Sequence, residues 1–502
     1  MGGRRFHRLR PRHPAQDGDQ VMNRRFFIKS AMAGVVAASP LMQFAKAAPG
    51  KIMKGYQSAP DAGFARKTMR LVAGDVPKGF RGTYFLNGPA KHDRGGERYE
   101  HWFDGDGMVH AFRFGDEGAT HEGRFVETPK FIEEREAGRF IYPTFGTIPE
   151  NPGPITGPDD INAANISVLS VGDQIWALWE GGSPTALRPD DLSTEGFVTL
   201  GEGLKGVPVS AHPRVDTDGV IWSFGNAAMS GQLLLYKIMP DGSLAKFKVL
   251  NDLPHSMVHD FTMSERYLIV GFAPFLAENN DGAYLDRFNW HGDQARQYVV
   301  IDKESFEIVR RYELPAGFVF HHSPAWEEKD GTIRFGACTY KNADIMLVDT
   351  RAIMKGDVYA GNNHAVFEAV TLYPDGRAVA TTDGGAAEFP VADPRLAGKA
   401  STTFHIGRQK AENYLSNTLF ARNEAGDVTG SWAASADTEM GEHVAVPKAG
   451  GGVWLIGTEF DAARGRTLVS LFDGDALSAG PRAVWEAPQT LPVPLHGTWV
   501  GA

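Results

Sequence analysis

The sequence contains a single cysteine, Cys338, among its 502 residues. A disulfide within the chain needs two cysteines, and a metal site built on thiolates needs several. Both are therefore excluded, and any metal site must draw its ligands from other side chains. The 16 histidines are one such source.

Basic residues are also fewer than acidic ones. The chain has 51 lysine and arginine residues against 61 aspartate and glutamate residues, and its formal net charge is −10. A protein that binds nucleic acid needs a clustered basic face to contact the phosphates. We therefore expect no nucleic-acid partner. The hydrophobic share of 42% and the charged share of 22% are ordinary for a soluble globular protein.

The sequence also lacks an apolar run long enough for a membrane span, which takes about 20 residues. The weakly apolar run 31–44 follows the arginine pair Arg24-Arg25 and precedes a small-x-small cleavage site, Ala45-Lys46-Ala47. This order predicts a twin-arginine export signal, with residues 1–47 as N-terminal extension and signal peptide. The mature protein would then be periplasmic. A short basic tail before a helix is the alternative.

Glycine and proline, by contrast, are abundant, with 58 and 30 residues. They leave little room for long helices, and no linker or shift of composition divides residues 48–502. Short apolar or alternating segments predict strands, and Asp-Gly pairs between them predict hairpin turns. These pairs stand at 106–107, 218–219, 241–242, 281–282, 330–331, 375–376 and 473–474. Many short strands over this length favour an all-β propeller that forms a single domain.

Four histidines stand in distinctive local sequences, whereas most of the others show no such pattern. His212 is in SAHPRVD, His259 in MVHDF, His321 in FVFHHSPAW and His496 in PLHGTW. They are spread over more than half of the chain, unlike the closely spaced histidines of a helical metal motif. This spacing suits a propeller, because the innermost strand of each blade approaches the central axis and can bring one imidazole to a shared metal ion.

Three further histidines lie near functional segments. His322 directly follows His321, but adjacent residues of a strand point to opposite faces, so only one of the two can easily face the axis. We interpret His255 and His443 as bystanders. Imidazole ligands suit iron, copper, nickel and zinc, so the ligand type alone leaves the metal open.

The four histidine segments resemble the four iron-ligand motifs of the carotenoid cleavage oxygenases. Residues 100–110, EHWFDGDGMVH, are similar to the N-terminal signature of that family. Three more segments are similar to those that carry the family's glutamates: ALWEGG at 177–182, EFP at 388–390 and GE at 441–442. The matches occur in the family's order and cover most of the chain.

The resemblance implies a seven-bladed β-propeller with a metal on the central axis and a helical or loop cap over one face. The cofactor would be Fe(II), and its ligands would form the catalytic centre: His212, His259, His321 and His496. Three carboxylates would hold three of these histidines, fixing and activating their rings as ligands. The carboxylates are those of Glu180, Glu388 and Glu442. The family's His-x-x-Asn-Ala pattern selects His321 over His322, with Pro324 in place of the usual asparagine.

By the same resemblance the protein would be a dioxygenase that takes O2 and an apolar conjugated alkene. It would cleave one C=C bond of a carotenoid or apocarotenoid into two carbonyl products. A stilbene- or phenylpropanoid-cleaving oxygenase is the alternative. Those enzymes add a lysine and a tyrosine that grip a phenol, and the corresponding places fall on Trp179 and near Phe145, neither of which can polarise a phenol. Tyr142 or Lys130 can take a similar role. The two replacements favour a polyene.

Two other roles remain open on the same fold. A non-cleaving isomerase would rearrange its substrate without O2, and a carrier would bind an apolar ligand without any reaction. The apolar segment 271–277, GFAPFLA, is expected in a loop. It can make a peripheral membrane contact that collects lipid-soluble substrate, or it is a buried loop.

Overall fold

The computed structural model describes residues 53–278, 281–357, 363–409 and 415–502, which belong to one compact unit, Lys46–Ala502. The expected signal at residues 1–47 lies outside the described residues. Among the helices that are described, none combines the length and the apolar character that crossing a membrane requires. Strands dominate this part of the chain, as the abundance of turn residues predicts.

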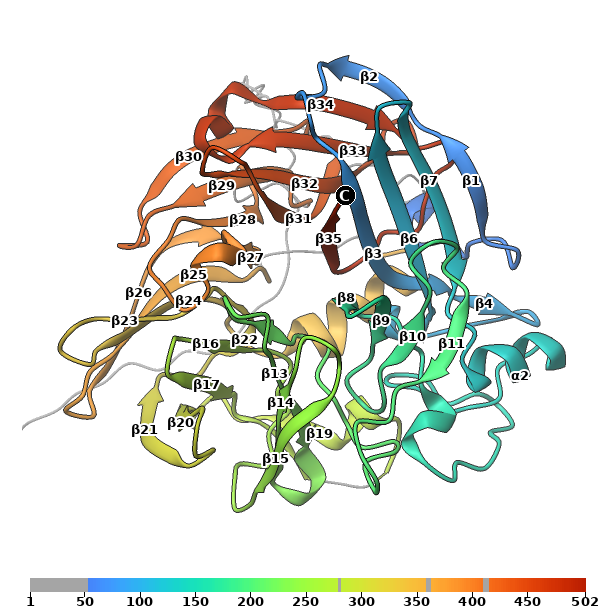
Figure 1. Cartoon of the computed structure of the whole chain (residues 1–502). Coiled ribbons are helices and arrows are strands. Elements are labelled where there is room, and N and C mark those ends of the chain that lie inside the picture. Colours follow the sequence, from blue (N-terminus) through green and yellow to red (C-terminus); the bar gives the residue numbers. More distant parts are fainter. Residues whose placement is uncertain (1–52, 279–280, 358–362, 410–414) are drawn as a thin grey trace, which may run out of the picture. The chain divides into compact units, whose positions relative to one another are not determined.

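In the described residues, seven antiparallel sheets of four or five strands follow one another around a ring and form the blades of a β-propeller (Figure 1). The predicted seven-bladed, all-β fold is thus confirmed. The first blade contains β1 (Phe64–Thr68), β7 (Gly118–Phe125), β6 (Asp106–Gly115), β3 (Gly82–Lys91) and β35 (Gly497–Gly501). The second contains β11 (Thr194–Phe197), β10 (Thr185–Leu187), β9 (Gln174–Leu178) and β8 (Ser167–Val171).

The next three blades are built from consecutive parts of the chain. The third contains β12 (Arg214–Val215), β13 (Ile221–Ala227), β14 (Gln232–Ile238) and β15 (Leu244–Leu250). The fourth contains β16 (Phe261–Met263), β17 (Tyr267–Phe272), β20 (Arg296–Asp302) and β21 (Ile308–Leu314). The fifth contains β22 (Phe318–His322), β24 (Ile333–Tyr340), β25 (Val366–Leu372) and β26 (Ala378–Ala386), with β23 (Trp326–Glu327) paired to β24.

The last two blades complete the ring. The sixth contains β27 (Glu388–Val391), β28 (Thr403–Gly407), β29 (Thr418–Arg422) and β30 (Val428–Ala433). The seventh contains β31 (Thr438–Pro447), β32 (Val453–Asp461), β33 (Arg466–Asp473), β34 (Pro481–Glu486) and β2 (Arg70–Gly74). Two small hairpins lie outside the blades: β4 (Asp93–Arg94) with β5 (Glu97–Arg98), and β18 (Phe275–Ala277) with β19 (Phe288–Trp290).

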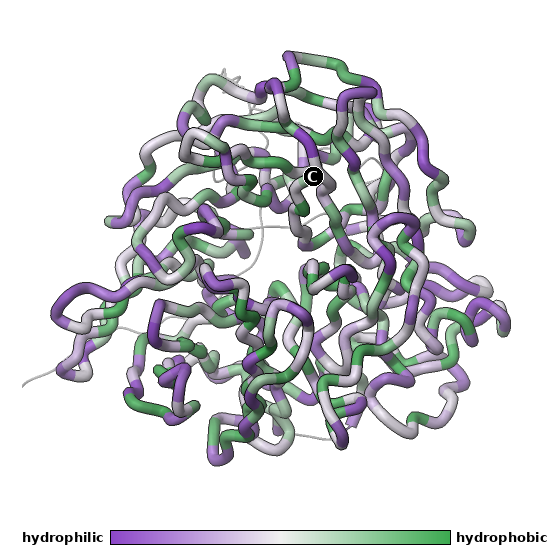
Figure 2. Tube along the Cα trace, viewed as in Figure 1, coloured by the Kyte–Doolittle hydropathy of each residue, from purple (hydrophilic) through white to green (hydrophobic). Residues whose placement is uncertain are grey.

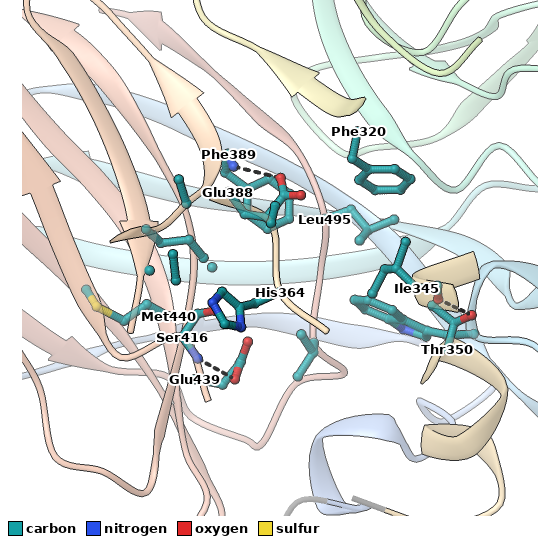
Figure 3. A pocket seen from close by; sticks show the side chains of 18 of the residues that line it. Phe320, Ile345, Thr350, His364, Glu388, Phe389, Ser416, Glu439, Met440 and Leu495 are labelled. Carbon is teal, nitrogen blue, oxygen red and sulfur yellow. Dashed lines mark hydrogen bonds between the residues drawn. The ribbon is translucent and has the colours of Figure 1, made fainter. Parts of the chain in front are cut away.

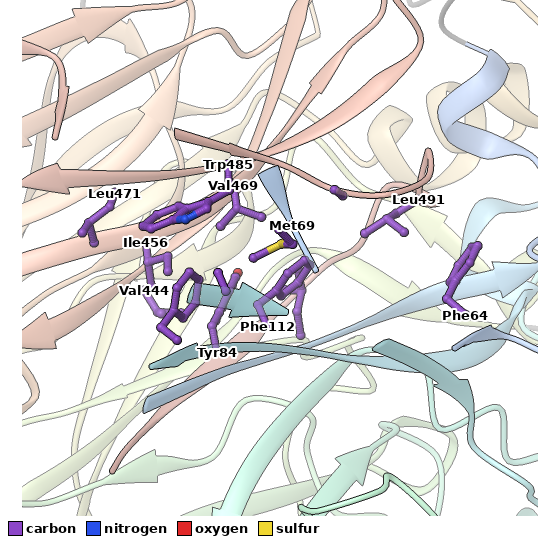
Figure 4. Packing of buried hydrophobic residues seen from close by; sticks show 14 of the residues in the cluster. Phe64, Met69, Tyr84, Phe112, Val444, Ile456, Val469, Leu471, Trp485 and Leu491 are labelled. Atoms are coloured by element: carbon purple, nitrogen blue, oxygen red, sulfur yellow. The ribbon is translucent and has the colours of Figure 1, made fainter. Parts of the chain in front are cut away.

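Both ends of the described chain close the ring. The last strand, β35, pairs with β3 of the first blade, while β2 pairs with β34 of the seventh. Figure 4 shows the packing between these two blades, where Tyr84 and Phe112 meet Val469 and Trp485. Burying one such large apolar side chain stabilises the fold by about 1.5–3 kcal/mol, so packing reinforces the strand pairing at the closure.

Most of the Asp-Gly pairs form hairpin turns, as predicted. Four of the glycines, at 219, 242, 331 and 376, adopt positive φ between neighbouring strands, as hairpin turns require. Three of the seven pairs do not form turns between strands. Asp106-Gly107 begins β6, Asp281-Gly282 precedes the short helix η5 (Tyr284–Arg287), and Asp473-Gly474 leads from β33 into a short helix. Figure 2 shows hydrophilic residues frequent in the outer turns and hydrophobic stretches along the strands.

Short helices connect the blades. Those that pack around one another are η1 (Met53–Tyr56), η2 (Trp102–Asp104), η5 (Tyr284–Arg287), η6 (Ile345–Asp349) and α3 (Thr350–Met354). The other helices in the described residues are α2 (Pro129–Ala137), η3 (Pro158–Ile161), η4 (Ala228–Ser230), η7 (Pro394–Leu396) and η8 (Gly474–Ala479). The α2 helix begins at the N-cap Thr128, whose hydroxyl accepts a hydrogen bond from the Phe131 N–H, and ends at the left-handed Gly138.

The apolar segment 271–277 is not an exposed loop. Its residues finish β17 and begin β18, and Phe272 and Phe275 are 2% and 0% exposed. The two phenylalanines pack in apolar clusters of the described core. Phe272 and Phe275 are therefore not available to a membrane surface, so the expected membrane contact through these two side chains is wrong, whereas Leu276 near the end of the segment is part-buried.

Candidate metal centre

The propeller brings the four distinctive histidines to one point. His212, His259 and His496 stand just before β12, β16 and β35, and His321 is in β22, so each comes from a different blade. One ring nitrogen from each of the four histidines lies within 4.8 Å of the other three. The ring centroids of His212 and His259 are 4.4 Å apart, and those of His321 and His496 are 5.0 Å apart.

The free nitrogens of this cluster fit a metal ion. The Nε2 atoms of His212, His259 and His321 are buried and have no hydrogen-bond partner. A buried polar nitrogen without a partner costs about 1–3 kcal/mol. Three such atoms converging on one point are the donor set of a metal site rather than of a hydrogen-bonded core. The residues present therefore fit a divalent metal, as the family's ligand set implies.

Carboxylates hold three of the four rings from behind. Nδ1 of His321 donates to Oε2 of Glu388 at 2.5 Å, and Nδ1 of His496 donates to Oε1 of Glu442 at 3.2 Å. Nδ1 of His259 pairs with Glu180. Such bonds fix the tautomer that leaves Nε2 free. His212 differs, since no carboxylate pairs with its ring among the described residues.

The four histidines and three glutamates are distributed one to each blade. The first, third, fourth and fifth blades each supply one histidine, while the second, sixth and seventh each supply one glutamate. Glu180 follows β9, Glu388 begins β27 and Glu442 lies in β31. Every blade therefore contributes one side chain to the axis, which explains why the seven residues are so far apart in the sequence.

Burial sets the protonation of the rings. Burial, reinforced by the neighbouring histidines, holds the pKa of His212 and His321 well below its usual range, so both rings are neutral at pH 7. Burial alone would also lower the pKa of His259, but Glu180 raises it above its ordinary value. Burial raises the pKa of Glu388 to about 8. Neutral imidazole is the form that binds metal, so the environment of His212 and His321 prepares them as ligands.

Irregular pairing places extra side chains at the centre. The register of β22 shifts between Val319 and His321, so Phe320 is an additional residue that also points to the site. Its ring stacks on His259 at 4.1 Å with an interplanar angle of 10°. The register of β27 shifts after Glu388, and Phe389, at φ 54°, lies 5.1 Å from the His321 ring. Sequence reasoning missed both phenylalanines, because simple alternation places them on the opposite faces.

His322 lies away from the cluster, as the alternation rule predicts. Its Nε2 lies 3.3 Å from the Tyr298 hydroxyl, and its Nδ1 lies 3.4 Å from Asp260. His255 is exposed, and His443 bonds through Nδ1 to the Gly441 carbonyl at 2.9 Å. None of the three belongs to the four-histidine cluster.

Two cavities meet at the histidine cluster. The large cavity, of about 550 Å³, is mainly apolar, and the small cavity has about 110 Å³. Both are lined by Phe103, Ile166 and His259, and the small one also reaches His496. Trp179 and Phe145 line the large cavity, together with Tyr284, which sequence reasoning missed.

Lys130 and Tyr142 do not line either cavity. The ammonium group of Lys130 is fully buried between Asp106, at 2.6 Å, and Glu134, at 3.0 Å. The hydroxyl of Tyr142 donates to Glu133. The idea that either residue polarises a phenol in the substrate cavity is therefore wrong, because both donors are already used elsewhere.

A buried ion pair joins three of the blades that carry the histidines. Nη2 of Arg214, two residues after His212, donates to both carboxylate oxygens of Asp260, at 2.7 and 2.8 Å. Asp260, next to His259, also accepts the backbone N–H of His322 at 2.7 Å. Burial would raise the pKa of Asp260, but Arg214 and His322 lower it below its usual value, so it stays ionised. We call this group the Asp260 clasp.

Replacing Asp260 with alanine is expected to weaken both the fold and the metal site. Breaking a buried pair costs about 3–5 kcal/mol, and loss of groups that orient ligands lowers metal affinity about 10–100-fold. Chelator competition gives the affinity, and chemical denaturation gives the stability. Asp216→Ala is the control, since within the described part of the chain Asp216 bonds only to the Trp222 indole and to local backbone in the same blade. Unchanged affinity in Asp260→Ala would show that the clasp does not position the ligands.

Comparisons with known proteins agree with this geometry. The family model of the retinal pigment epithelial membrane protein matches residues 60–501. An apocarotenoid-15,15'-oxygenase from Synechocystis sp. is 31% identical over 489 residues, covering 90% of this chain and 96% of the relative. A carotenoid 9,10(9',10')-cleavage dioxygenase 1 from Pisum sativum is 25% identical, with 86% of each chain covered.

A solved structure shows the same fold. The cobalt-substituted apocarotenoid oxygenase of Synechocystis superimposes with a TM-score of 0.80 at 29% identity, covering 90% of this chain and 99% of that chain. Sequence, fold and the convergence of four histidines thus lead to one assignment. The chain belongs to the retinal pigment epithelial membrane protein family, the family of the carotenoid cleavage oxygenases.

Proposed function

We propose that the protein is a non-haem Fe(II) dioxygenase that uses O2 to cleave one C=C bond of an apolar conjugated alkene into two carbonyl products. The alkene is of the carotenoid or apocarotenoid class. The observation that carries the proposal is the convergence of four imidazoles, three of them with buried, unpartnered Nε2 atoms. The relatives whose names describe oxygenase or dioxygenase cleavage of carotenoids and apocarotenoids support it.

The residues divide the work around the metal. His212, His259, His321 and His496 would hold the ion, which would activate O2 for reaction with the alkene, whose C=C bond supplies the electrons. Four neutral imidazoles leave the ion's charge uncompensated, and the glutamates behind them would supply negative charge one layer out. The positive charge of a bound ion would lower the pKa of Glu388 and so favour its ionised form too. Phe320 and Phe389 pack against the ligand rings, which limits the entry of water beside them.

The large cavity favours a polyene. No lysine or arginine occurs among the described residues that line it, and Trp179 and Phe145 cannot polarise a phenol. Burial, with Glu180 nearby, raises the pKa of Tyr284 to about 12, so its hydroxyl stays neutral. Shape and apolar contact are therefore the main means of recognition, and the stilbene alternative is disfavoured because the described residues that line the cavity offer no lysine for its phenol.

Anaerobic loading with Fe(II), followed by O2, tests the proposal. Apocarotenals and stilbenes are offered side by side, and products are identified by mass after reaction with ¹⁸O2. Aldehydes labelled from O2 on the apocarotenal fragments are expected. Labelled products from stilbenes alone would reverse the choice of substrate. Rearranged substrate without O2 uptake would favour the isomerase, and unaltered substrate would favour a carrier.

We also propose that residues 1–47 direct export to the periplasm and that residues 48–502 form one domain. The order of arginine pair, apolar run and small-x-small site supports this. Replacing Arg24 and Arg25 with lysine is expected to retain the protein in the cytoplasm, as judged by cell fractionation.

Peripheral membrane contact is proposed through exposed Ile148, Ile155 and Val348, and vesicle co-sedimentation of a triple serine variant tests it.

A further inference from the structure

The two cavities give the two halves of a substrate different amounts of space. They meet at Phe103, Ile166 and His259, so an alkene held at the histidine cluster would extend into both. The large cavity of about 550 Å³ lies in the range of about 300–1,000 Å³ typical of small-molecule sites. The small cavity of about 110 Å³ is smaller than a cavity of about 150 Å³ that holds one benzene ring. The part of the substrate in the small cavity must therefore be short.

Polar groups gather at one end of the small cavity. Figure 3 shows His364, Ser416 and Glu439 on one side of it, opposite the Phe320, Ile345 and Thr350 side. The Ser416 N–H donates to Glu439 Oε2 at 3.2 Å, and Nδ1 of His364 is buried without a partner. A buried polar atom of this kind costs about 1–3 kcal/mol unless a ligand or water satisfies it.

The protonation of these groups suits an oxygen-bearing ligand. Burial raises the pKa of Glu439 to about 8, so at pH 7 its carboxyl group can donate as well as accept a hydrogen bond. Burial lowers the pKa of His364, so this imidazole is neutral. Arg408 lines the same cavity, and its positive charge opposes the rise in the pKa of Glu439, although burial prevails. Glu439 and His364 can both bond to a hydroxyl or carbonyl oxygen.

We propose that the small cavity binds an oxygen-bearing end group of the substrate, a hydroxyl or a carbonyl, through His364 and Glu439. These two are then specificity-determining residues, and the bond that is cleaved lies a few carbons from the oxygenated end. This rests on the proposed function and names its substrate class. In the cleavage one C=C bond breaks, two C=O bonds form and each fragment gains one atom of O2, so no further reductant is needed.

The test compares two conjugated alkenes that differ only at the short end, one with a terminal hydroxyl and one with a methyl cap. Wild-type protein is expected to prefer the hydroxylated substrate about tenfold in kcat/KM, as one buried hydrogen bond allows. Glu439→Leu and His364→Phe are expected to remove most of this preference, and Glu439→Gln to keep part of it. Mass analysis is expected to place the cleaved bond near the hydroxylated end.

Glu459→Gln is the matched control. Glu459 is a buried carboxyl group in β32 whose pKa burial also raises, to about 7, but it lines neither cavity. It is expected to leave the preference unchanged. A second readout needs no metal: titration calorimetry should show that the saturated alcohol binds the metal-free protein more tightly than the methyl-capped alkane does, and only while Glu439 and His364 are present.

The outcomes separate this inference from the proposed function. Cleavage of both substrates at equal rates, with no effect of Glu439→Leu or His364→Phe, would overturn the inference and leave the dioxygenase intact. Cleavage in the middle of the chain, with two long fragments, would overturn it too. Absence of any cleavage would instead contradict the proposed function, and alcohol binding to the metal-free protein would still decide the inference.

Discussion

Replacing His321 with alanine is expected to abolish stable metal binding and, with it, the oxygen chemistry. A structural metal ion held by four ligands contributes about 10–16 kcal/mol, so each ligand accounts for roughly 3 kcal/mol, or about a hundredfold in affinity. His321 is the fourth of the five residues of the inner strand β22, and Glu388 accepts a hydrogen bond from its Nδ1. Its loss would also leave that buried carboxyl group without its ring partner. Metal content after dialysis and chelator competition measure the effect.

The neighbouring residue supplies the control. His322 is buried to the same extent as His321, at 2% against 3% exposure, but its ring contacts Tyr298 and Asp260 instead of the cluster. His322→Ala is expected to lower stability while the protein keeps its metal. Equal metal loss in both variants would mean that general unfolding, not ligand removal, explains the His321 result. Full metal content in His321→Ala would contradict the four-histidine site.

The four histidines of this centre were predictable because distinctive residues flank each of them in the sequence. His212, His259, His321 and His496 each stand in a specific local sequence. The glutamates were identified by resemblance alone, since a single carboxylate in a turn-rich chain carries no signal of its own. The structure adds that each of the seven blades supplies one of these seven residues.

The unpredicted parts depend on backbone irregularities. The inner strands β22, β27 and β31 all shift register beside the site. A bulge changes which face a side chain points to, and the sequence shows no mark of it. Phe320 and Phe389 are at the centre for this reason. The cavity walls were equally hidden, because Trp179, Tyr284 and Met346 come from separate loops and helices that only the folded chain brings together.

Asp106-Gly107 shows how a local rule is overridden. The pair is a strong turn signal, yet it begins β6, and Asp106 is 1% exposed. Its carboxylate pairs with Lys130 from α2 and lies 3.3 Å from Arg94. A buried charge needs partners, and both partners lie outside the dipeptide. The tertiary ion pairs, rather than the turn propensity, therefore decide the local structure here.

Replacing Lys130 with methionine is expected to be among the most destabilising single changes in the described fold. The Lys130 ammonium group donates to Asp106 at 2.6 Å, to Glu134 at 3.0 Å and to the Tyr99 hydroxyl at 2.8 Å, all in the protein interior. Burial alone would lower the pKa of Lys130, but the two carboxylates raise it, so it is charged. Methionine keeps the volume and leaves two buried carboxyl groups short of a partner, at a cost of about 3–5 kcal/mol.

Lys448 offers the matched comparison. It also bridges two carboxylates, those of Asp473 at 2.6 Å and Asp475 at 2.5 Å, but Asp475 is 65% exposed. Water screens such a surface pair, so Lys448→Met is expected to cost at most about 1 kcal/mol. Guanidinium denaturation followed by tryptophan fluorescence compares the two midpoints. Equal shifts would mean that burial does not strengthen the Lys130 network. A larger shift for Lys130→Met would place the α2 helix among the elements that depend on a buried charge for their attachment to the first blade.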